Sequence, residues 1–436
     1  MGSTPAVGLQ KTITVRHGVA LAVSLVIGSG LLGLPGVALA ESGVHATAVG
    51  WLLVVAVAAP MVAIFSRLGL RLQSAAGLAA YAELAVGRWG AWAVGTVMAG
   101  TFGIGLPALA LIGASYLGQL LGTPSGMIPW LAIGILAAAT VANLFGVRAT
   151  NMINTASLVA LVVVVLVIVV LKMSLLGTGA ETAVRSVQGA GSFSYVEVWQ
   201  VCALLFWAFL GWEGLSFGLE EFRDPHRSIP LVYWLSFVLV IALYLALGLT
   251  AIGAQVAGVD VTGASGLARL LATTPVGDAL VVIMVLVILA NANAWVFGAS
   301  RMVYAGGRDG MLPAYLARLS RRGAPVAGLL TLLALSSAVL VAVQFTETFS
   351  LSRLILIASQ NLIVLYVFCV LAYWKTERGW PRWPVTAGAV VSVAFLLSGF
   401  SGWIAYPLAL LALGYLRWRR QRSDGEQPKQ PAKAAT

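Results

Sequence analysis

The sequence predicts an all-α polytopic membrane protein with twelve transmembrane helices, and three observations lead to this fold class. Of the 436 residues, 60% are hydrophobic and only 9% are charged, which leaves too little polar surface to cover a soluble protein. Apolar runs long enough to cross the ~30 Å hydrocarbon core of a bilayer recur along most of the chain. The lysines and arginines between these runs gather on one side of the predicted membrane.

The apolar runs define twelve expected spans. Residues 15–176 form a first unit of five spans, and residues 196–372 form a second unit of five. A loop at 177–195 joins the two units, and residues 373–418 hold the last two spans. The expected spans are 15–40, 45–69, 88–121, 127–147, 152–176, 196–222, 229–254, 276–306, 323–345, 348–372, 383–400 and 402–418.

The basic residues predict the orientation of the chain. All but four of the 26 lysines and arginines fall on the side that holds both termini, which places both termini in the cytoplasm and the loop 177–195 in the periplasm. The N-terminal segment 1–14 and a basic tail at 419–436, expected to be disordered, therefore lie in the cytoplasm. The net charge of +11 is spread in small groups between apolar runs, so it indicates contact with anionic lipid rather than nucleic acid.

Two of the expected spans carry glycine clusters near their centres. The first is Ile27-Gly28-Ser29-Gly30-Leu31 in span one, and the second is Phe209-Leu210-Gly211-Trp212-Glu213-Gly214 in span six. An isolated glycine pair usually marks close helix packing. Two clusters at equivalent positions of two units predict instead that helices one and six are broken. Because five spans separate them, the second unit is inverted, which predicts a 5+5 inverted repeat plus two extra helices.

A broken helix predicts a binding site because the backbone groups that it frees need polar partners. The half-helix after Gly30 would direct its positive end at a carboxylate, and the carbonyl groups freed between Phe206 and Leu210 would suit an ammonium group. Aromatic residues near the break and in span eight are expected to enclose a side chain, although ordinary packing explains Phe206 and Phe209 equally well. The candidate substrate-binding residues are Ile27, Gly28, Ser29, Gly30, Leu31, Phe206, Trp207, Ala208, Phe209, Leu210, Gly211 and Trp295.

Glu213 is the one acidic residue expected deep inside a span. A charge at that depth costs about 2.5–3.5 kcal/mol on insertion scales. Protonation would remove the cost and would make Glu213 a candidate proton carrier or gate, whereas a purely structural hydrogen bond is the alternative. Cys202 and Cys369 are expected in the apolar interior, and the scattered histidines show no metal-ligand spacing, so neither a metal nor another cofactor is expected.

Four motifs resemble the amino acid-polyamine-organocation transporter family, and the match runs in order through nearly the whole chain. Within this family, the sequence resembles the bacterial exporters of methionine and branched-chain amino acids. The motifs are Ile27-Gly28-Ser29-Gly30, Phe206-Trp207-Ala208-Phe209-Leu210-Gly211-Trp212-Glu213, Arg223-Asp224-Pro225 and Gly307-Arg308-Asp309-Gly310-Met311-Leu312-Pro313.

The resemblance implies a LeuT-like fold, in which spans one, two, six and seven rock against a scaffold that includes spans three, four, eight and nine. The chain departs from some members at Leu161, where they carry a lysine that imitates a sodium ion. Coupling is therefore expected to depend on Glu213 or on exchange. The implied roles are carboxylate binding by Gly28, Ser29 and Gly30, amine binding by the backbone from Trp207 to Leu210, gating by Trp207, proton sensitivity at Glu213, and pocket shaping by Trp295 and Tyr366.

Together these features predict a secondary transporter of neutral hydrophobic L-amino acids (methionine, leucine, isoleucine or valine) in the bacterial inner membrane. Its expected partners are the amino acid, protons and the lipid bilayer, and the oligomeric state, monomer or homodimer, stays open. Export is favoured by the resemblance alone.

Other readings stay open beside this one. A cationic amino acid or polyamine transporter would call for a second acid near Glu213, although arginine could stack on Trp207 and Trp295. A membrane sensor or channel is the alternative of another class. An enzyme is not expected, because the spans show no clustered acid, base and nucleophile.

Overall fold

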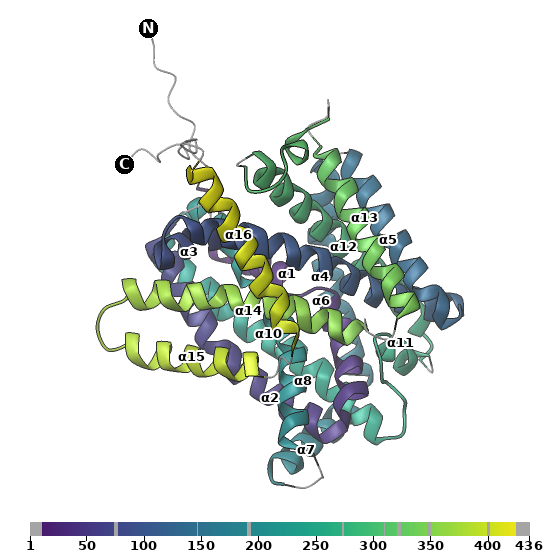
Figure 1. Cartoon of the computed structure of the whole chain (residues 1–436). Coiled ribbons are helices and arrows are strands. Elements are labelled where there is room, and N and C mark those ends of the chain that lie inside the picture. Colours follow the sequence, from purple (N-terminus) through teal and green to yellow (C-terminus); the bar gives the residue numbers. More distant parts are fainter. Residues whose placement is uncertain are drawn as a thin grey trace.

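The chain is all-helical throughout the part described by the computed structural model, apart from one isolated bridge between Ile13 and Phe222 (Figure 1). The described residues are 11–73, 77–145, 147–189, 193–272, 274–308, 310–320, 324–346, 350–398 and 402–423. The α-helices are α1 (Val15–Val26), α2 (Ser29–Arg71), α3 (Leu78–Val86), α4 (Trp89–Leu121), α5 (Ile128–Phe145), α6 (Val147–Leu171), α7 (Met173–Val187), α8 (Tyr195–Leu205), α9 (Trp212–Leu215), α10 (Pro225–Val256), α11 (Gly266–Leu271), α12 (Gly277–Arg308), α13 (Val326–Phe345), α14 (Leu351–Thr376), α15 (Arg382–Ser398) and α16 (Ala405–Ser423).

Eight helical segments in the described part are long and apolar enough to cross a membrane, or nine if α6 and α7 together form one bent span. The helix α2 counts once in this number although it has 43 residues. At a rise of 1.5 Å per residue it is about 65 Å long, roughly twice the hydrocarbon thickness of a bilayer. Gly43 has a non-helical φ of 67° within it, so α2 changes direction at the point where two expected spans meet.

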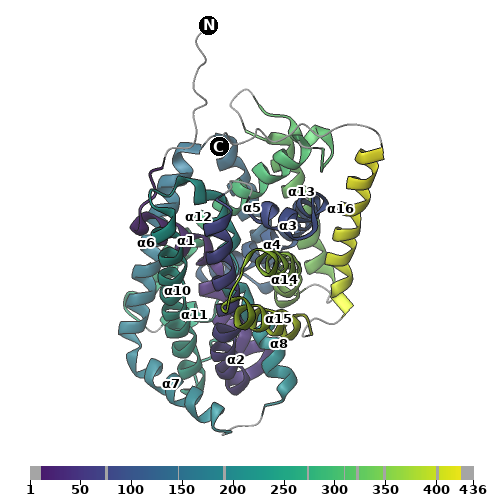
Figure 2. The ribbon, with the colours of Figure 1, turned by 90° about the vertical axis from the view of Figure 1, so that its left-hand side faces the viewer.

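The structure corrects two expected boundaries. Much of the loop expected at 177–195 is the helix α7, which meets α6 at an angle of 83°, so the expected span at 152–176 ends early, at Leu171. The helix α7 lies at one end of the molecule and packs on α10 (Figure 2). Its residue Ser186 is hydrogen-bonded to His45 of α2 at 2.8 Å. The second correction is that α16 continues to Ser423, so the first residues of the tail expected at 419–436 are helical. Residues 1–10 and 424–436 lie outside the described residues.

Both expected helix interruptions are present. The helix α1 ends at Val26, Ile27 and Gly28 leave helical geometry, and α2 begins at Ser29. In the second interruption, α8 is followed by a 3-10 turn, Phe206–Phe209, and Leu210 is extended. Gly211 then adopts a φ of 115°, a conformation that side chains disfavour, before the short helix α9 begins.

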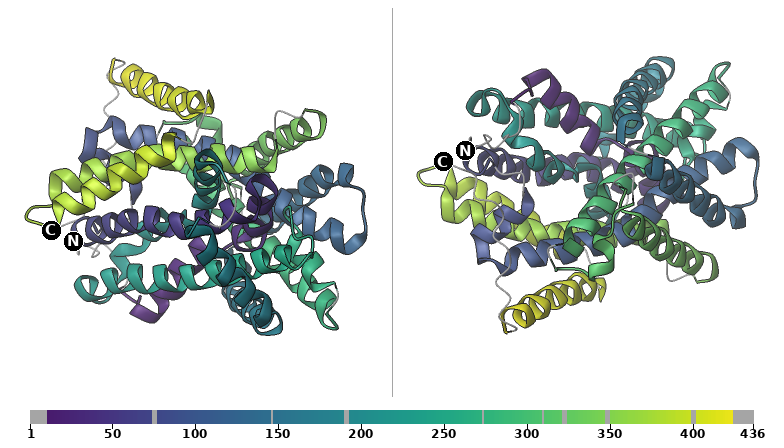
Figure 3. Two further views of the ribbon diagram at one scale, coloured as in Figure 1. Left: turned by 90° about the horizontal axis from the view of Figure 1, so that it is seen from below. Right: turned by 90° about the horizontal axis from the view of Figure 1, so that it is seen from above.

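The long helices pack in two groups around these interruptions. One group consists of α1, α2, α8 and α10, and the other consists of α4, α5, α12 and α13. The helix α14 packs on α4 and α2, α15 packs on α14 and α2, and α16 lies at the edge of the molecule against α4 (Figure 3). The two interruptions therefore lie within the first group, and the first of them meets α12 of the second group through the Ser29 N–H.

Candidate functional site

The gap between α1 and α2 is closed on one side by an amide from α12. The backbone N–H of Ser29, at the N-terminus of α2, donates a 3.2 Å hydrogen bond to Oδ1 of Asn291. The first N–H groups of a helix have no partner inside the helix and carry the positive end of its dipole. A neutral amide oxygen therefore lies at the helix N-terminus where the sequence predicts a carboxylate.

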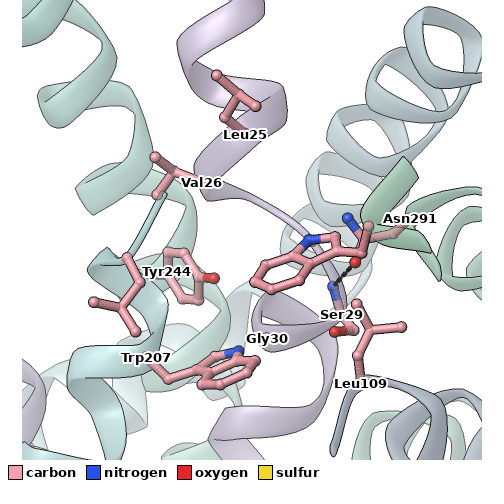
Figure 4. A pocket seen from close by; sticks show the side chains of 11 residues that line it. Leu25, Val26, Ser29, Gly30, Leu109, Trp207, Tyr244 and Asn291 are labelled. Carbon is pink, nitrogen blue, oxygen red and sulfur yellow. Dashed lines mark hydrogen bonds between the residues drawn. The ribbon is translucent and has the colours of Figure 1, made fainter. Parts of the chain in front are cut away.

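A small cavity lies beside this helix terminus (Figure 4). Its volume is about 20 Å³, which is enough for a single water molecule and too small for an amino acid. Both interruptions contribute to its wall. The lining residues are Leu25, Val26, Gly28, Ser29, Gly30, Leu109, Trp207, Leu210, Tyr244, Asn291 and Trp295.

Two tryptophans cover one side of this small cavity. The indoles of Trp207, in the 3-10 turn, and Trp295, on α12, are stacked with ring centroids 6.1 Å apart and an interplanar angle of 13°. Phe102 of α4 meets Trp295 edge-on at 5.8 Å. Trp207 and Tyr244 can approach the start of α2 closely because residue 30 is a glycine. A Cβ at Gly30 would lie 3.0 Å from Trp207 and 3.2 Å from the Tyr244 hydroxyl. The surfaces around the cavity are thus aromatic and compact.

A larger vestibule of about 490 Å³ lies on the other side of the α1–α2 gap. It follows α1 from His17, near the start of that helix, to Gly28 at the break, and faces α6 and α12. Leu25, Gly28 and Asn291 line both the small cavity and the vestibule. These three residues therefore form the wall between the two spaces.

Glu213 lies next to the second interruption and is buried. Its Oε2 accepts a 2.6 Å hydrogen bond from the Tyr366 hydroxyl of α14 and a 3.0 Å bond from the backbone N–H of Gly211. Neither Glu213 nor Tyr366 lines the small cavity or the vestibule. The carboxyl group is thus positioned to hold the shape of the second interruption and to link it to α14.

Comparison with known sequences identifies the family. The sequence profile of the amino acid permease family matches residues 14–428, nearly the whole chain. The chain belongs to this family. The expected family resemblance is thereby confirmed, and the two interruptions, the small cavity and the vestibule are features of an amino acid permease.

Several curated permeases are similar over most of their length. The uncharacterized amino acid permease YecA of Bacillus subtilis is 29% identical over 413 residues, covering 93% of this chain and 95% of its own. The L-methionine/branched-chain amino acid exporter YjeH of Escherichia coli is 24% identical over 412 residues, with the same coverage of both chains. The putrescine transporter PotE of Escherichia coli is 26% identical over 322 residues, 71% of each chain. The relatives thus include transporters of neutral and of cationic compounds.

The structure brings about half of the expected binding residues of this permease together. Gly28, Ser29, Gly30, Trp207, Leu210 and Trp295 line the small cavity, and Ile27 lines the vestibule. Leu31, Phe206, Ala208, Phe209 and Gly211 line neither space. Phe206 instead packs on Tyr366, and Phe209 packs on Phe237 and Tyr244.

The site also contains residues that the sequence analysis did not include. Leu25, Val26, Leu109, Tyr244 and Asn291 all line the small cavity. Four of them are apolar or aromatic residues in apolar helices, where nothing in the sequence separates them from core positions. Asn291 had a detectable signal, because it is a polar residue in the middle of a membrane span.

The electrostatics of the permease site are those of a neutral pocket. Among the described residues that line either space, none is an aspartate or a glutamate, and His17, in the vestibule, is the one basic side chain. Within the described part of the chain, no three histidine, cysteine, aspartate or glutamate residues gather where a metal ion could bind. The polar groups around the small cavity are therefore backbone groups, hydroxyls, indole N–H groups and one amide.

Proposed function

We propose that this permease is a secondary active transporter of neutral hydrophobic L-amino acids that works by alternating access. The observation that carries the proposal is the composition of the small cavity: a helix N-terminus on one side, stacked indoles on another, and no acidic side chain in its described lining. An amino acid would need this cavity to enlarge, so its entry requires movement of the surrounding helices.

The two interruptions suit the two charged groups of an amino acid. The N-terminus of α2, from Ser29, offers N–H groups and a positive dipole end to the carboxylate. The C-terminal ends of α1 and of the 3-10 turn before Leu210 present carbonyl groups that suit the ammonium group. Both charges would thus be satisfied by backbone, and the apolar side chain would meet the surface that Trp207 and Trp295 provide.

A neutral side chain fits the cavity better than a cationic one. A second positive charge, as in arginine or putrescine, would be buried without a carboxylate among the described lining residues, and burial of an unpaired charge is costly. Glu213 does not supply that partner, because it lies outside both spaces and accepts hydrogen bonds from Tyr366 and Gly211. Stacking of a guanidinium group on the indoles remains the argument for the cationic alternative.

The order of the helices supports a 5+5 inverted repeat within twelve spans. In the first half, a broken helix and a long helix are followed by the short α3 and then by α4, α5 and α6. In the second half, the broken α8–α9 segment and the long α10 are followed by the short α11 and then by α12, α13 and α14. Counting α2 as parts of two spans, and adding α15 and α16, gives the twelve spans that we propose, with both termini in the cytoplasm.

The packing of the long helices supports rocking of one group against the other. In the first group α10 packs on α1 and α2, and α2 packs on α8, whereas in the second group α4, α5, α12 and α13 all pack on one another. In the proposed orientation, the vestibule beside α1 faces the cytoplasm. On the periplasmic side, the Tyr116 hydroxyl of α4 donates a 2.9 Å hydrogen bond to the Leu32 carbonyl of α2, which joins the two groups. The arrangement corresponds to a state open towards the cytoplasm.

The proposed mechanism also includes proton coupling and a direction of amino acid transport. We assign proton coupling to Glu213, with pure exchange as the alternative, because its buried carboxyl group connects the second interruption to α14. Export is favoured by the similarity to the methionine and branched-chain amino acid exporter of Escherichia coli. An efflux assay in cells loaded with labelled methionine would measure the direction separately from the substrate.

Counterflow in proteoliposomes tests the substrate assignment. Vesicles loaded with unlabelled L-methionine should accumulate labelled L-methionine, and leucine should block this accumulation whereas arginine and putrescine should not. If arginine or putrescine blocked the accumulation of labelled methionine, the protein would be assigned to the transporters of cationic amino acids or polyamines. Ligand binding without any flux would indicate a sensor, and flux without competition or exchange would indicate a channel.

A further inference from the structure

Asn291 occupies a position between the two groups of helices. It lies on α12, in the second group, and its amide accepts the Ser29 N–H of α2, in the first group. The approach is close because residue 28 is a glycine: a Cβ at Gly28 would lie 2.7 Å from both Oδ1 and Nδ2 of the amide. The contact is therefore shaped for the amide and leaves no room for a side chain.

The same amide lies in the wall between the small cavity and the vestibule. Asn291 lines both spaces, together with Leu25 and Gly28, and it is partly exposed. One helical turn further along α12, Trp295 lines the small cavity but not the vestibule. Movement of the Asn291 side chain would thus connect the two spaces and at the same time free the Ser29 N–H.

We propose that Asn291 is a latch that closes the inner passage of the empty transporter by standing in for the substrate carboxylate at the N-terminus of α2. Its amide oxygen and a carboxylate oxygen are both acceptors, and they compete for the same N–H group. Arrival of the amino acid therefore releases the latch, and release frees the N-terminus of α2 from α12. This inference rests on the proposed function, because it uses the amino acid carboxylate as the competing ligand.

The latch has a consequence for affinity that a purely structural hydrogen bond lacks. The substrate must break the bond between Ser29 and Asn291 before it can bind, so the bond lowers apparent affinity. Removing the amide in Asn291→Ala should tighten binding of L-methionine about twofold to tenfold, the range expected for one net hydrogen bond. Asn291→Asp, of the same shape, should hold the N–H more strongly as a carboxylate and weaken binding.

The experiment has two readouts. The first is binding of labelled L-methionine to the purified transporter, compared with competition by L-methioninol, which lacks the carboxylate. The second needs no substrate: Leu109→Cys places a thiol on the wall of the small cavity, and its labelling by a small methanethiosulfonate reagent from the vestibule side reports passage past Asn291. The native Cys202 and Cys369 are buried, and the protein without Leu109→Cys gives the background.

A neighbouring amide on the same helix provides the matched control. Asn293 accepts a 2.8 Å hydrogen bond from Asn143 of α5 and lines neither space. Asn293→Ala should leave both readouts unchanged. Asn291→Ala should speed labelling and strengthen methionine binding but not methioninol binding, and Asn291→Asp should have the opposite effect on labelling and on methionine.

Each result bears on the latch. Effects of the same sign in both Asn291 variants, or equal changes for methionine and methioninol, would overturn it, because a merely structural amide predicts them. If the wild-type protein binds no amino acid, the proposed function fails, and the labelling readout still decides whether Asn291 closes the passage. Unchanged labelling in folded Asn291→Ala would then reject the latch.

Discussion

The Tyr366 hydroxyl donates a 2.6 Å hydrogen bond to Oε2 of Glu213, although the two residues are 153 positions apart in the sequence. The same oxygen accepts the backbone N–H of Gly211 at 3.0 Å. One carboxyl group thus ties the second helix interruption to α14. A change in the protonation of this group would alter both hydrogen bonds at once. The geometry of the second interruption would then depend on the protonation state of Glu213.

We therefore expect Glu213→Gln to flatten the pH dependence of transport. Glutamine keeps an oxygen that can accept both hydrogen bonds but does not exchange a proton in this range. The measurement is the initial rate of methionine counterflow across a series of pH values. Tyr366→Phe is the control, because it removes one donor and keeps the carboxyl group, so its rate should still depend on pH. A Glu213→Gln profile parallel to wild type would remove Glu213 from proton coupling.

Gly211→Ala should lower thermal stability strongly. At a φ of 115°, a residue with a Cβ is strained by about 1–2 kcal/mol, and the Cβ would lie 2.6 Å from the Leu25 carbonyl oxygen and 3.0 Å from its carbon. Since these are backbone atoms, rotation of a side chain cannot relieve the overlap. The melting temperature of the purified protein in detergent measures the effect. Gly103→Ala in α4, where nothing lies within 4 Å, should leave it unchanged or raise it.

Trp295→Ala should weaken binding of leucine and methionine about tenfold, while Trp295→Phe should have a smaller effect. The substitution by alanine removes the stacked pair with Trp207 and part of the apolar wall of the cavity, and an aromatic pair contributes about 0.5–1.5 kcal/mol beyond its buried area. Equilibrium binding of the labelled amino acids measures the change. Trp383→Ala, at a tryptophan that is 61% exposed, should not affect affinity. Unaltered affinity in Trp295→Ala would place the side-chain pocket elsewhere.

The two interruptions could be predicted because their cause is local. Glycine clusters in the middle of otherwise apolar spans mark the positions where the helix ends, and the structure breaks at Ile27 and Gly28 and again from Phe206 to Gly211. The continuity of α2 was not expected. Its two halves meet at Gly43 without a loop, since one residue with a φ of 67° is enough to redirect the chain.

The rest of the site depends on contacts that are distant in sequence. Leu109 and Tyr244 lie in the helices α4 and α10, and only the packing of these helices places both on one cavity. Asn291 is noticeable in the sequence as a polar residue within a span, but its pairing with Ser29, 262 positions away, depends on the packing of α12 against the first interruption. The helix α7 was missed because one apolar face, packed on α10, is enough to make a helix of a segment that is too polar to cross a membrane.

Tyr116→Phe should shift the transporter towards its outward-open state. The Tyr116 hydroxyl donates a 2.9 Å hydrogen bond to the Leu32 carbonyl and so joins α4 to α2, on the periplasmic side of the cavity in the proposed orientation. Loss of one net hydrogen bond, about 0.5–1.5 kcal/mol, changes the ratio of two conformations about twofold to tenfold. Labelling of Leu109→Cys by an impermeant reagent added from the periplasmic side should accelerate by the same factor.

The chain offers a matched control for this substitution. The Tyr406 hydroxyl of α16 also donates to a backbone carbonyl of α4, that of Gly100, at 3.1 Å. Because α16 lies at the edge of the molecule, Tyr406→Phe removes an equivalent hydrogen bond without releasing α2. Faster periplasmic labelling in Tyr116→Phe alone would identify the bond to Leu32 as part of the outer closure. Equal labelling in both variants and wild type would mean that packing, and not this hydrogen bond, keeps the outer side closed.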